Sequence, residues 1–234
     1  MQLFYSKDLD HGATTYTFSK EESKHIHKVL RKSEGDTLHV TNGKGLLSKG
    51  VITFASTQRC EIAIQESSQK PARPYRLHMV VAPVKMNDRF EWFLEKATEI
   101  GVDEITPILC DHSERKVIKI ERYEKILQSA MKQSHQTYLP KLNALIPFSK
   151  FLANAQEGIL CIAHCQDSLK QHPKQLISAG QNVTILIGPE GDFSTNEINL
   201  ALKQGYNPIT LGTTRLRTET AAIVAVHSIA FINS

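Results

Sequence analysis

Two short apolar strands, each followed at once by a glycine-bearing turn, constrain the fold of this chain more than any other feature of its sequence. The run from Val183 to Ile187 is rich in β-branched residues, carries no charge and leads directly into Gly188-Pro189-Glu190-Gly191, as is typical of a strand buried on both faces. Ser194-x-x-Glu197 then has the form of a capping box, and Gly205 stands where the following helix would end. This segment predicts a complete strand-turn-helix unit.

A second unit of the same kind follows immediately. Pro208 to Leu211 predicts a strand, Gly212 opens the next turn, and Thr218 begins a last helix with apolar residues at helical intervals. Both strands therefore end in glycine-bearing turns at the same edge of a sheet. Ligands bind at that edge in folds built from such units, so a ligand site is expected here.

The rest of the chain divides into two regions of different pattern. Residues 1–70 contain short runs of β-prone residues and one helix opened by Ser19, which predicts a small β-barrel with a single helix. The stretch from Ser67 to Pro74 holds two prolines and is expected to be a linker. In residues 75–234 strands alternate with helices, which predicts an α/β domain around a mostly parallel sheet.

Composition argues against several classes of protein. The chain has 234 residues, of which 41% are hydrophobic, enough for a buried core. Its amino terminus lacks the pattern of a secretory signal, and its longest weakly polar stretch, Thr220 to Ile232, is shorter than the roughly 20 apolar residues that span a bilayer. The sequence therefore predicts a cytoplasmic protein without a membrane segment, and its four cysteines are expected to be buried, reduced thiols.

Basic residues are concentrated in the first third of the chain. Residues 1–75 hold 11 Lys and Arg against 8 Asp and Glu, a net charge of +3 within a total of +4. The run from Lys24 to Lys32 gathers much of this excess, and such a surface can bind phosphate groups. His25-x-His27 has no third ligand at a suitable spacing, so no metal site is expected.

The glycine motifs do not match two familiar phosphate-binding signatures. The chain contains no G-x-x-x-x-G-K-[ST], and Gly188 to Gly191 does not fit G-x-G-x-x-G. The carboxylate of Glu190 would also repel a polyanion, whereas it is compatible with a zwitterionic or cationic ligand. These features argue against a nucleoside triphosphatase and against a dinucleotide-binding domain.

A family resemblance is carried by Gly188 to Gly191, Leu211-Gly212 and Leu216-Arg217-Thr218-Glu219-Thr220-Ala221. At this spacing they resemble the C-terminal signature of the SPOUT methyltransferases, and specifically of the ribosomal RNA small subunit methyltransferase E (RsmE) family. The resemblance continues through Lys85–Arg89, Glu95–Val102, Met131–Ser134, and His27–Arg31 with Gly35-Asp36. One departure is Asp192, where a second glycine is expected. We therefore expect this position not to need the most permissive backbone, although Asp tolerates unusual dihedral angles.

The resemblance implies a fold, a cofactor and a reaction. The fold would be an N-terminal PUA-like β-barrel followed by a SPOUT α/β domain with a deep trefoil knot. The reaction would be methylation of N3 of a specific uridine in 16S (small-subunit) ribosomal RNA, with S-adenosylmethionine as cofactor, by a homodimer acting on the RNA or the small ribosomal subunit. The residues that the resemblance places around the cofactor are Gly188, Pro189, Glu190, Gly191, Leu211, Gly212, Leu216 and Thr218.

This reaction requires a charge-stabilising group beside the acceptor base. N3 of uridine must lose a proton to become a good nucleophile, which leaves negative charge on the two neighbouring carbonyl oxygens. The forked donors of Arg217 suit that charge, and Glu219 is expected to orient Arg217 or to accept the proton. The cations expected to contact RNA are Lys28, Arg31, Lys32, Arg89, Arg115 and Lys116.

Two alternatives stay open at the level of the sequence. A SPOUT methyltransferase could instead act on ribose 2′-hydroxyls or on transfer RNA, although Lys85–Arg89 and Met131–Ser134 favour the ribosomal target. The chain could also be a non-catalytic RNA-binding protein that has kept the fold, but the presence of Gly188, Arg217 and Glu219 argues against it. Failure to bind S-adenosylmethionine would favour this second alternative.

Overall fold

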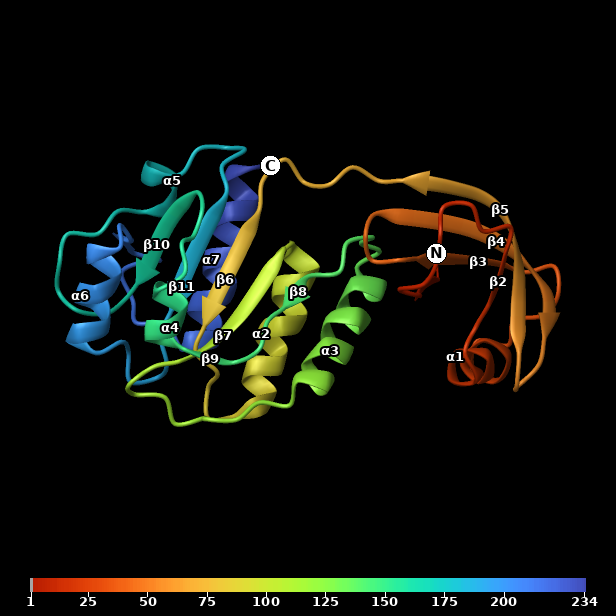
Figure 1. Ribbon diagram of the computed structural model, residues 1–234, viewed down its shortest axis with the longest axis horizontal. Coiled ribbons are helices and arrows are strands. Elements are labelled where there is room, and N and C mark those ends of the chain that lie inside the picture. Colours follow the sequence, from red (N-terminus) through yellow and green to blue (C-terminus); the bar gives the residue numbers. More distant parts are fainter. Residues whose placement is uncertain (1) are drawn as a thin grey trace. The chain divides into compact units, whose positions relative to one another are not determined.

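A computed structural model describes residues 2–234 of the chain (Figure 1). The chain forms two compact units. The first contains the N-terminal segment through Ala72 together with Met131–Leu139, and the second contains Arg73–Ala130 and Pro140–Ser234. No helix in the described part of the chain is both long and apolar enough to cross a membrane.

The first unit is built on a five-stranded sheet with the order β1-β3-β4-β5-β2. Its strands are β1 (Leu3–Tyr5), β2 (Thr15–Thr17), β3 (Thr37–Thr41), β4 (Leu46–Ala55) and β5 (Cys60–Gln69). The pair β1 and β3 is parallel and the other pairs are antiparallel. Alternate residues of β3 and β4, among them Leu38 and Val40, point into a buried apolar cluster, because successive side chains of a strand face opposite sides of the sheet.

The helix of the first unit changes its geometry partway along. Its first part, α1 (Lys20–Lys24), begins as predicted, because the Ser19 hydroxyl caps it by accepting a hydrogen bond of 3.2 Å from the Glu22 N–H. The chain continues as a π-helical turn, η1 (His25–Val29), in which Ile26 is buried and its neighbours are exposed. Arg31 then adopts a φ of +54°. The predicted single helix is therefore an α-helix that widens into a π-turn, a feature frequent at functional sites.

Met131–Leu139 belongs to the first unit although it lies far along the chain. Backbone and side-chain contacts both hold it: Gly45 N donates to Thr137 O at 2.9 Å, and Leu139 N donates to Gly43 O at 2.9 Å. The Thr41 hydroxyl donates to the same Thr137 carbonyl at 3.2 Å, and the Tyr138 hydroxyl donates to Lys70 O at 2.8 Å. The sequence did not indicate this arrangement, because contacts between residues far apart in the chain leave no local pattern.

The second unit contains a seven-stranded sheet with the order β12-β10-β11-β6-β7-β8 and β9 paired to β7. All of these pairs are parallel. The strands are β6 (Leu77–Val81), β7 (Glu104–Leu109), β8 (Lys141–Leu142), β9 (Ile146–Pro147), β10 (Ile159–Ala163), β11 (Val183–Ile187) and β12 (Asn207–Ile209). The predicted parallel α/β arrangement is confirmed.

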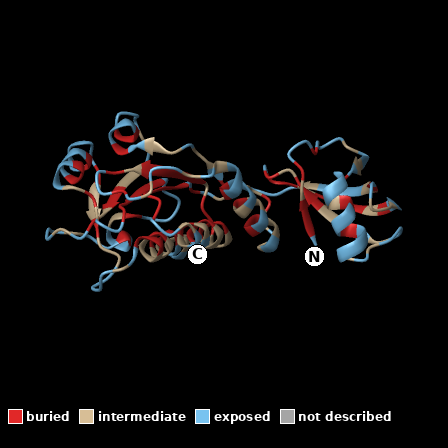
Figure 2. Cartoon of the chain, turned by 90° about the horizontal axis from the view of Figure 1, so that it is seen from below, coloured by how far each residue is buried: buried red, intermediate tan, exposed pale blue. Residues whose placement is uncertain are grey.

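Helices cover both faces of this sheet (Figure 1). They are α2 (Asn87–Ile100), α3 (Ile120–Gln133), which continues into the first unit, α4 (Phe148–Leu152), α5 (Pro173–Leu176), α6 (Thr195–Lys203) and α7 (Thr218–Ile232). On one face α7 packs against α2 and against β6 and β11, and on the other α4 packs against α6. Every residue of β6 and β11 is buried, as expected for central strands. Figure 2 shows the buried residues, in red, in the interior and the exposed residues, in pale blue, on the outer helices and loops.

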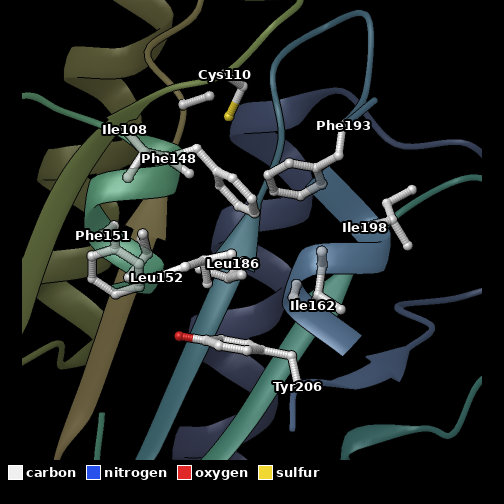
Figure 3. Close-up of a cluster of buried hydrophobic side chains, with 13 residues drawn as sticks. Ile108, Cys110, Phe148, Phe151, Leu152, Ile162, Leu186, Phe193, Ile198 and Tyr206 are labelled. Atoms are coloured by element: carbon white, nitrogen blue, oxygen red, sulfur yellow. The ribbon is translucent and has the colours of Figure 1, made fainter. Parts of the chain in front are cut away.

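An apolar cluster between α4, α6 and the sheet supports the ends of the central strands (Figure 3). The rings of Phe148 and Phe193 lie side by side, tilted by 47°, with their centroids 5.3 Å apart. Phe193 lies in the turn after β11, and a Cβ on Gly188 would come within 3.0 Å of its ring. Glycine at this position therefore allows the turn to fold back onto the core.

Gly158, just before β10, is a position where any larger residue should destabilise the second unit. Its φ is +84°, and an added Cβ would lie 2.2 Å from the carbonyl oxygen of Asn182, the acceptor for Ile159 N. We expect Gly158→Ala to lower the free energy of unfolding by about 3 kcal/mol, because left-handed strain and a backbone clash add together. The matched control is Gly180→Ala, with a φ of +82° and no atom within 4 Å of its added Cβ, which should cost only about 1 kcal/mol. Equal losses in urea unfolding would contradict this explanation.

Candidate functional site

Three loops of the second unit meet beyond the carboxyl ends of β11, β10 and β12. They comprise residues 188–194 after β11, 164–168 after β10, and 210–217 between β12 and α7. Strand β10 lies between the other two in the sheet, so the three loops are neighbours. This is the edge at which the sequence predicts a ligand site.

The loops enclose a cleft in two parts that differ in the number of charged side chains. The less charged part has a volume of about 450 Å³ and the charged part about 420 Å³. The residues of the less charged part are Ala163, His164, Cys165, Lys170, Ile209, Thr210, Leu211, Gly212, Thr213, Thr214, Arg215, Leu216 and Ala221. Those of the charged part are Arg89, Ala163, Cys165, Ile187, Gly188, Pro189, Glu190, Asp192, Arg215, Leu216, Arg217, Thr218, Glu219 and Ala221. Five residues line both parts, so the two form one continuous cleft.

Most of the residues predicted around the cofactor line this cleft. They are Leu211 and Gly212 in the less charged part, Gly188, Pro189, Glu190 and Thr218 in the charged part, and Leu216 in both. Gly191 lies outside the lining, and its carbonyl oxygen is 3.1 Å from Nδ1 of His112. Both predicted catalytic residues, Arg217 and Glu219, line the charged part.

Glu190 is held in place by the segment that precedes α2. Its Oε1 accepts a hydrogen bond of 2.8 Å from the backbone N–H of Lys85. This bond joins the turn after β11 to the loop after β6, two segments that the sequence singled out separately. The carboxylate of Glu190 is thus oriented by the protein before any ligand is present.

Glu219 and Arg217 have different surroundings, although they are two residues apart. Glu219 lies in the first turn of α7 with its side chain only 7% exposed, and its Oε1 is 3.9 Å from Nη1 of Arg89. Arg217 occupies the N-cap position of the same helix and is exposed. In residues 2–234 no ion pair of Arg217 is found. The ion pair of Arg89 with Glu219 also brings Arg89, predicted as an RNA contact, into the cleft.

His164 is a buried polar residue that the sequence indicated only weakly. It follows β10 directly, and both of its ring nitrogens are buried without a hydrogen-bond partner. Burial lowers the pKa of its imidazole, with a further lowering from Lys170, so the neutral ring is favoured. An unpaired buried donor or acceptor is costly, and His164 lines the less charged part of the cleft.

Asp192 occupies the position where a second glycine is expected. Its φ is +65°, in the left-handed region that Asp tolerates better than most residues, so the position does not need the most permissive backbone, as the sequence predicts. The side chain of Asp192 stabilises this conformation, because its Oδ2 accepts a hydrogen bond of 2.7 Å from Cys165 N and its Oδ1 accepts one of 2.8 Å from Phe193 N. The carboxylate thereby ties the loop after β11 to the loop after β10.

Hydrogen bonds of Glu197 also fix this region. The predicted capping box is present, since Ser194 N donates to Glu197 Oε2 at 2.8 Å and Glu197 N donates to Ser194 Oγ at 3.3 Å. Its other oxygen, Oε1, accepts from Asp111 N at 3.0 Å. This buried side chain therefore joins α6 to the loop that follows β7.

The cations predicted to contact RNA differ in their exposure and in their contacts with other residues. Lys28, Arg31 and Lys116 are exposed, whereas Lys32 Nζ lies 3.4 Å from a carboxylate oxygen of Asp36. Arg115 donates to the carbonyl oxygens of Val84 at 2.9 Å and of Lys85 at 2.6 Å. The guanidinium of Arg115 thus holds the loop before α2.

The cysteines are free, and three of the four are buried. Burial raises the pKa of the Cys60 thiol to about 11 and that of Cys161 to about 12, and it also raises the pKa of Cys110. Cys165 is exposed and lines the cleft, so the expectation of buried thiols was wrong for this residue. Across residues 2–234, no group of three or more His, Cys, Asp or Glu side chains is placed to hold a metal ion.

Comparison with known sequences places both units among proteins that modify RNA. Residues 71–230 match the RNA methyltransferase domain family, and residues 18–65 match the RNA methyltransferase PUA domain. Ribosomal RNA small subunit methyltransferase E of Buchnera aphidicola subsp. Acyrthosiphon pisum is 30% identical over 236 residues, covering 96% of this chain and 90% of the relative. The Bacillus subtilis protein of the same name is 26% identical, covering 94% and 91%.

Solved structures of methyltransferases are also similar to this chain. A probable rRNA-methyltransferase from Porphyromonas gingivalis is 38% identical, with a TM-score of 0.92 over 100% of this chain and 98% of the other. A putative methyltransferase from Legionella pneumophila, solved in complex with S-adenosylmethionine, is 26% identical, with a TM-score of 0.89 over 99% and 97% of the two chains.

Proposed function

Because the chain belongs to the RNA methyltransferase family that includes ribosomal RNA small subunit methyltransferase E, we propose that it methylates N3 of a specific uridine in 16S ribosomal RNA, using S-adenosylmethionine. The observation that supports this most directly is the two-part cleft at the carboxyl edge of the sheet. Its less charged part, which no carboxylate lines, suits the uncharged adenosyl group, and its charged part suits an amino-acid end and an acceptor base. The Legionella relative, solved with S-adenosylmethionine, supports the choice of cofactor.

The chemistry requires the protein to position two reactants and to stabilise changing charge. The cofactor supplies an electrophilic methyl group on a sulfonium, and in an in-line displacement the bond to sulfur breaks as the bond to N3 forms. The N3 proton must leave first or at the same time. In the proposed arrangement, Arg217 donates to the uracil oxygens that carry the resulting negative charge.

Glu219 and Arg89 act together in this proposal. The Oε1 of Glu219 lies 3.9 Å from the Arg89 guanidinium, and Glu219 stands in the first turn of α7. In this proposal Glu219 orients Arg89 and sets the position of the helix start that carries Arg217, and it is the carboxylate that receives the N3 proton. We propose Arg89 as a third member of the catalytic group, in place of a purely RNA-binding role.

The cofactor and RNA contacts follow from the same geometry. Gly188, Pro189, Glu190, Leu211, Gly212, Leu216 and Thr218 are proposed to bind the cofactor, and Gly191 to shape the turn. For RNA, we propose the exposed cations Lys28, Arg31 and Lys116, with Lys32 and Arg115 contributing charge from fixed positions. The π-turn η1 supports the assignment of Lys28, because it projects this residue outward while Ile26 anchors the turn.

Four structural features complete the proposal. We propose that residues 1–70 form a PUA-like barrel, which the match over residues 18–65 supports, and that residues 75–234 form a knotted SPOUT domain. The trefoil knot is supported by the path of the chain, since β12 lies beside β10 while α7, which follows it, packs against β6 and β11.

A homodimer is supported by exposed apolar surface on α7, where Phe231 is 72% exposed. A substrate of ribosomal RNA implies a cytoplasmic location.

Mass spectrometry of nucleosides from small-subunit ribosomal RNA tests the proposed reaction. In cells that lack this protein, we expect the loss of one 3-methyluridine, mapped to a single RNA fragment and restored by the wild-type chain. Restoration by a variant that carries Gly188→Val should fail, because the added side chain would collide with Phe193 and fill the turn. An unchanged level of 3-methyluridine would overturn the proposal and point to ribose methylation, transfer RNA or RNA binding alone.

A further inference from the structure

Asp192 combines an uncommon backbone conformation with a carboxylate inside the cleft. Its left-handed φ of +65° turns the side chain toward the loop after β10, where it accepts the N–H of Cys165. A second N–H, that of Phe193, fixes the other oxygen. A carboxylate has about four acceptor positions, so two backbone donors hold it in one orientation and leave capacity for a ligand.

The charges of the cleft are divided between its two main loops. Glu190 and Asp192 lie on the loop after β11, and neither is in an ion pair in the part of the chain that the structure describes. Arg215 and Arg217 lie on the opposite loop, before α7. Glu219 differs, because Arg89 already lies beside it. One side of the cleft is therefore available to a positive group and the other to a negative group.

Asp192 lies at the junction between the less charged part and the charged part. It lines the charged part, and its carboxylate accepts the N–H of Cys165, a residue that lines both. In S-adenosylmethionine the sulfur is the atom that joins the uncharged adenosyl group to the charged amino-acid chain. A ligand that places these two groups in the matching parts of the cleft brings its sulfur to this junction.

We propose that Asp192 is a specificity-determining residue that recognises the positive sulfur of the cofactor. The inference rests on the proposed function, because it requires S-adenosylmethionine to occupy the cleft. Methyl transfer converts the sulfonium into the neutral thioether of S-adenosylhomocysteine. The attraction to Asp192 is then lost, so this carboxylate favours the loaded cofactor and lets the product leave.

Isothermal titration calorimetry with S-adenosylmethionine and S-adenosylhomocysteine tests this role. Asp192→Asn removes the charge, keeps the shape and an acceptor oxygen, and tolerates a positive φ. We expect it to weaken binding of S-adenosylmethionine about five- to tenfold while changing binding of S-adenosylhomocysteine less than about twofold. Asp192→Gly, which keeps the backbone conformation and removes the whole side chain, should shift the ratio of the two affinities in the same direction.

The matched control is Asp167→Asn. Asp167 is an exposed acidic residue in the loop after β10 and does not line the cleft. Removing the charge of Asp167 should leave the ratio of the affinities for S-adenosylmethionine and S-adenosylhomocysteine as in the wild type. If Asp192→Asn leaves that ratio unchanged, the inference is overturned while the proposed function stands. If the wild-type chain binds neither ligand, the proposed function fails and the inference fails with it.

Discussion

Arg217→Ala is expected to lower the rate constant for methyl transfer by about 100- to 1000-fold while leaving the affinity for S-adenosylmethionine within about threefold of the wild type. This loss of rate is typical of enzymes from which one hydrogen-bond donor to the negative charge of the transition state has been removed. Arg217 lines the charged part of the cleft, is exposed, and has no ion-pair partner in the described part of the protein. Its guanidinium is therefore free to meet a uracil that has lost its N3 proton.

Single-turnover methylation of small-subunit RNA, with cofactor binding measured separately, distinguishes this role from a general loss of RNA affinity. Lys203→Ala is a suitable control, because it removes one positive charge from an exposed position on α6. That change should have little effect on the single-turnover rate at saturating RNA. Arg217→Lys keeps the charge but not the forked donors, and should recover only part of the activity. A wild-type rate in Arg217→Ala, with cofactor bound normally, would rule out the proposed role.

The site was predictable from the sequence where it depends on local pattern. The buried strand β11, the turn that follows it and the capping box at Ser194 are all encoded within a few consecutive residues. Their chemistry follows from the same residues, because parallel strands bring their carboxyl ends to one edge of the sheet. Most of the residues expected around the cofactor accordingly line the cleft.

The features that the sequence did not predict depend on long-range contacts or on backbone geometry. Arg89 and Glu219 are far apart in the chain, and neither residue type indicates that the two lie 3.9 Å apart. The left-handed conformation of Asp192 is stabilised by the N–H groups of Phe193, the next residue, and of Cys165, which lies in another loop, and the propensity of a residue does not show such contacts. Met131–Leu139 joins the first unit through hydrogen bonds to segments far away in the chain, which leave no local pattern in the sequence.

At the opposite, amino-terminal edge of the sheet lies a group of buried polar side chains that controls stability rather than ligand binding. Glu104, the first residue of β7, accepts hydrogen bonds from Lys141 Nζ at 3.1 Å and from Asn143 Nδ2 at 2.6 Å, and it also pairs with the guanidinium of Arg76. His78 Nε2 lies 2.7 Å from the hydroxyl of Thr106. These contacts join the starts of β6, β7 and β8.

Both titratable groups of this cluster make the second unit sensitive to acid. Burial alone would raise the pKa of Glu104, but the hydrogen bond from Asn143, the neighbouring His78, Lys141 and Arg76 outweigh it and lower the pKa to about 2. Burial lowers the pKa of His78 to about 4. In each case the unfolded chain binds the proton more tightly, so folding stability falls as the pH decreases. The contribution of His78 is lost from about pH 6.5 to 4, and that of Glu104 from about pH 4.5 to 2.

Glu104→Gln is therefore expected to lower the free energy of unfolding at pH 7 by about 3 kcal/mol, the order given by the shift of its pKa from 4.5 to about 2. By pH 3 the wild type has lost more than half of this contribution, so the difference between the two proteins should shrink to roughly 1 to 1.5 kcal/mol. Urea unfolding at both pH values measures the effect, with Glu124→Gln on an exposed turn of α3 as the control for charge. A constant difference between pH 7 and pH 3 would mean that Glu104 acts through packing alone, because only an ionised carboxylate that is bound more strongly in the folded state makes the difference depend on pH.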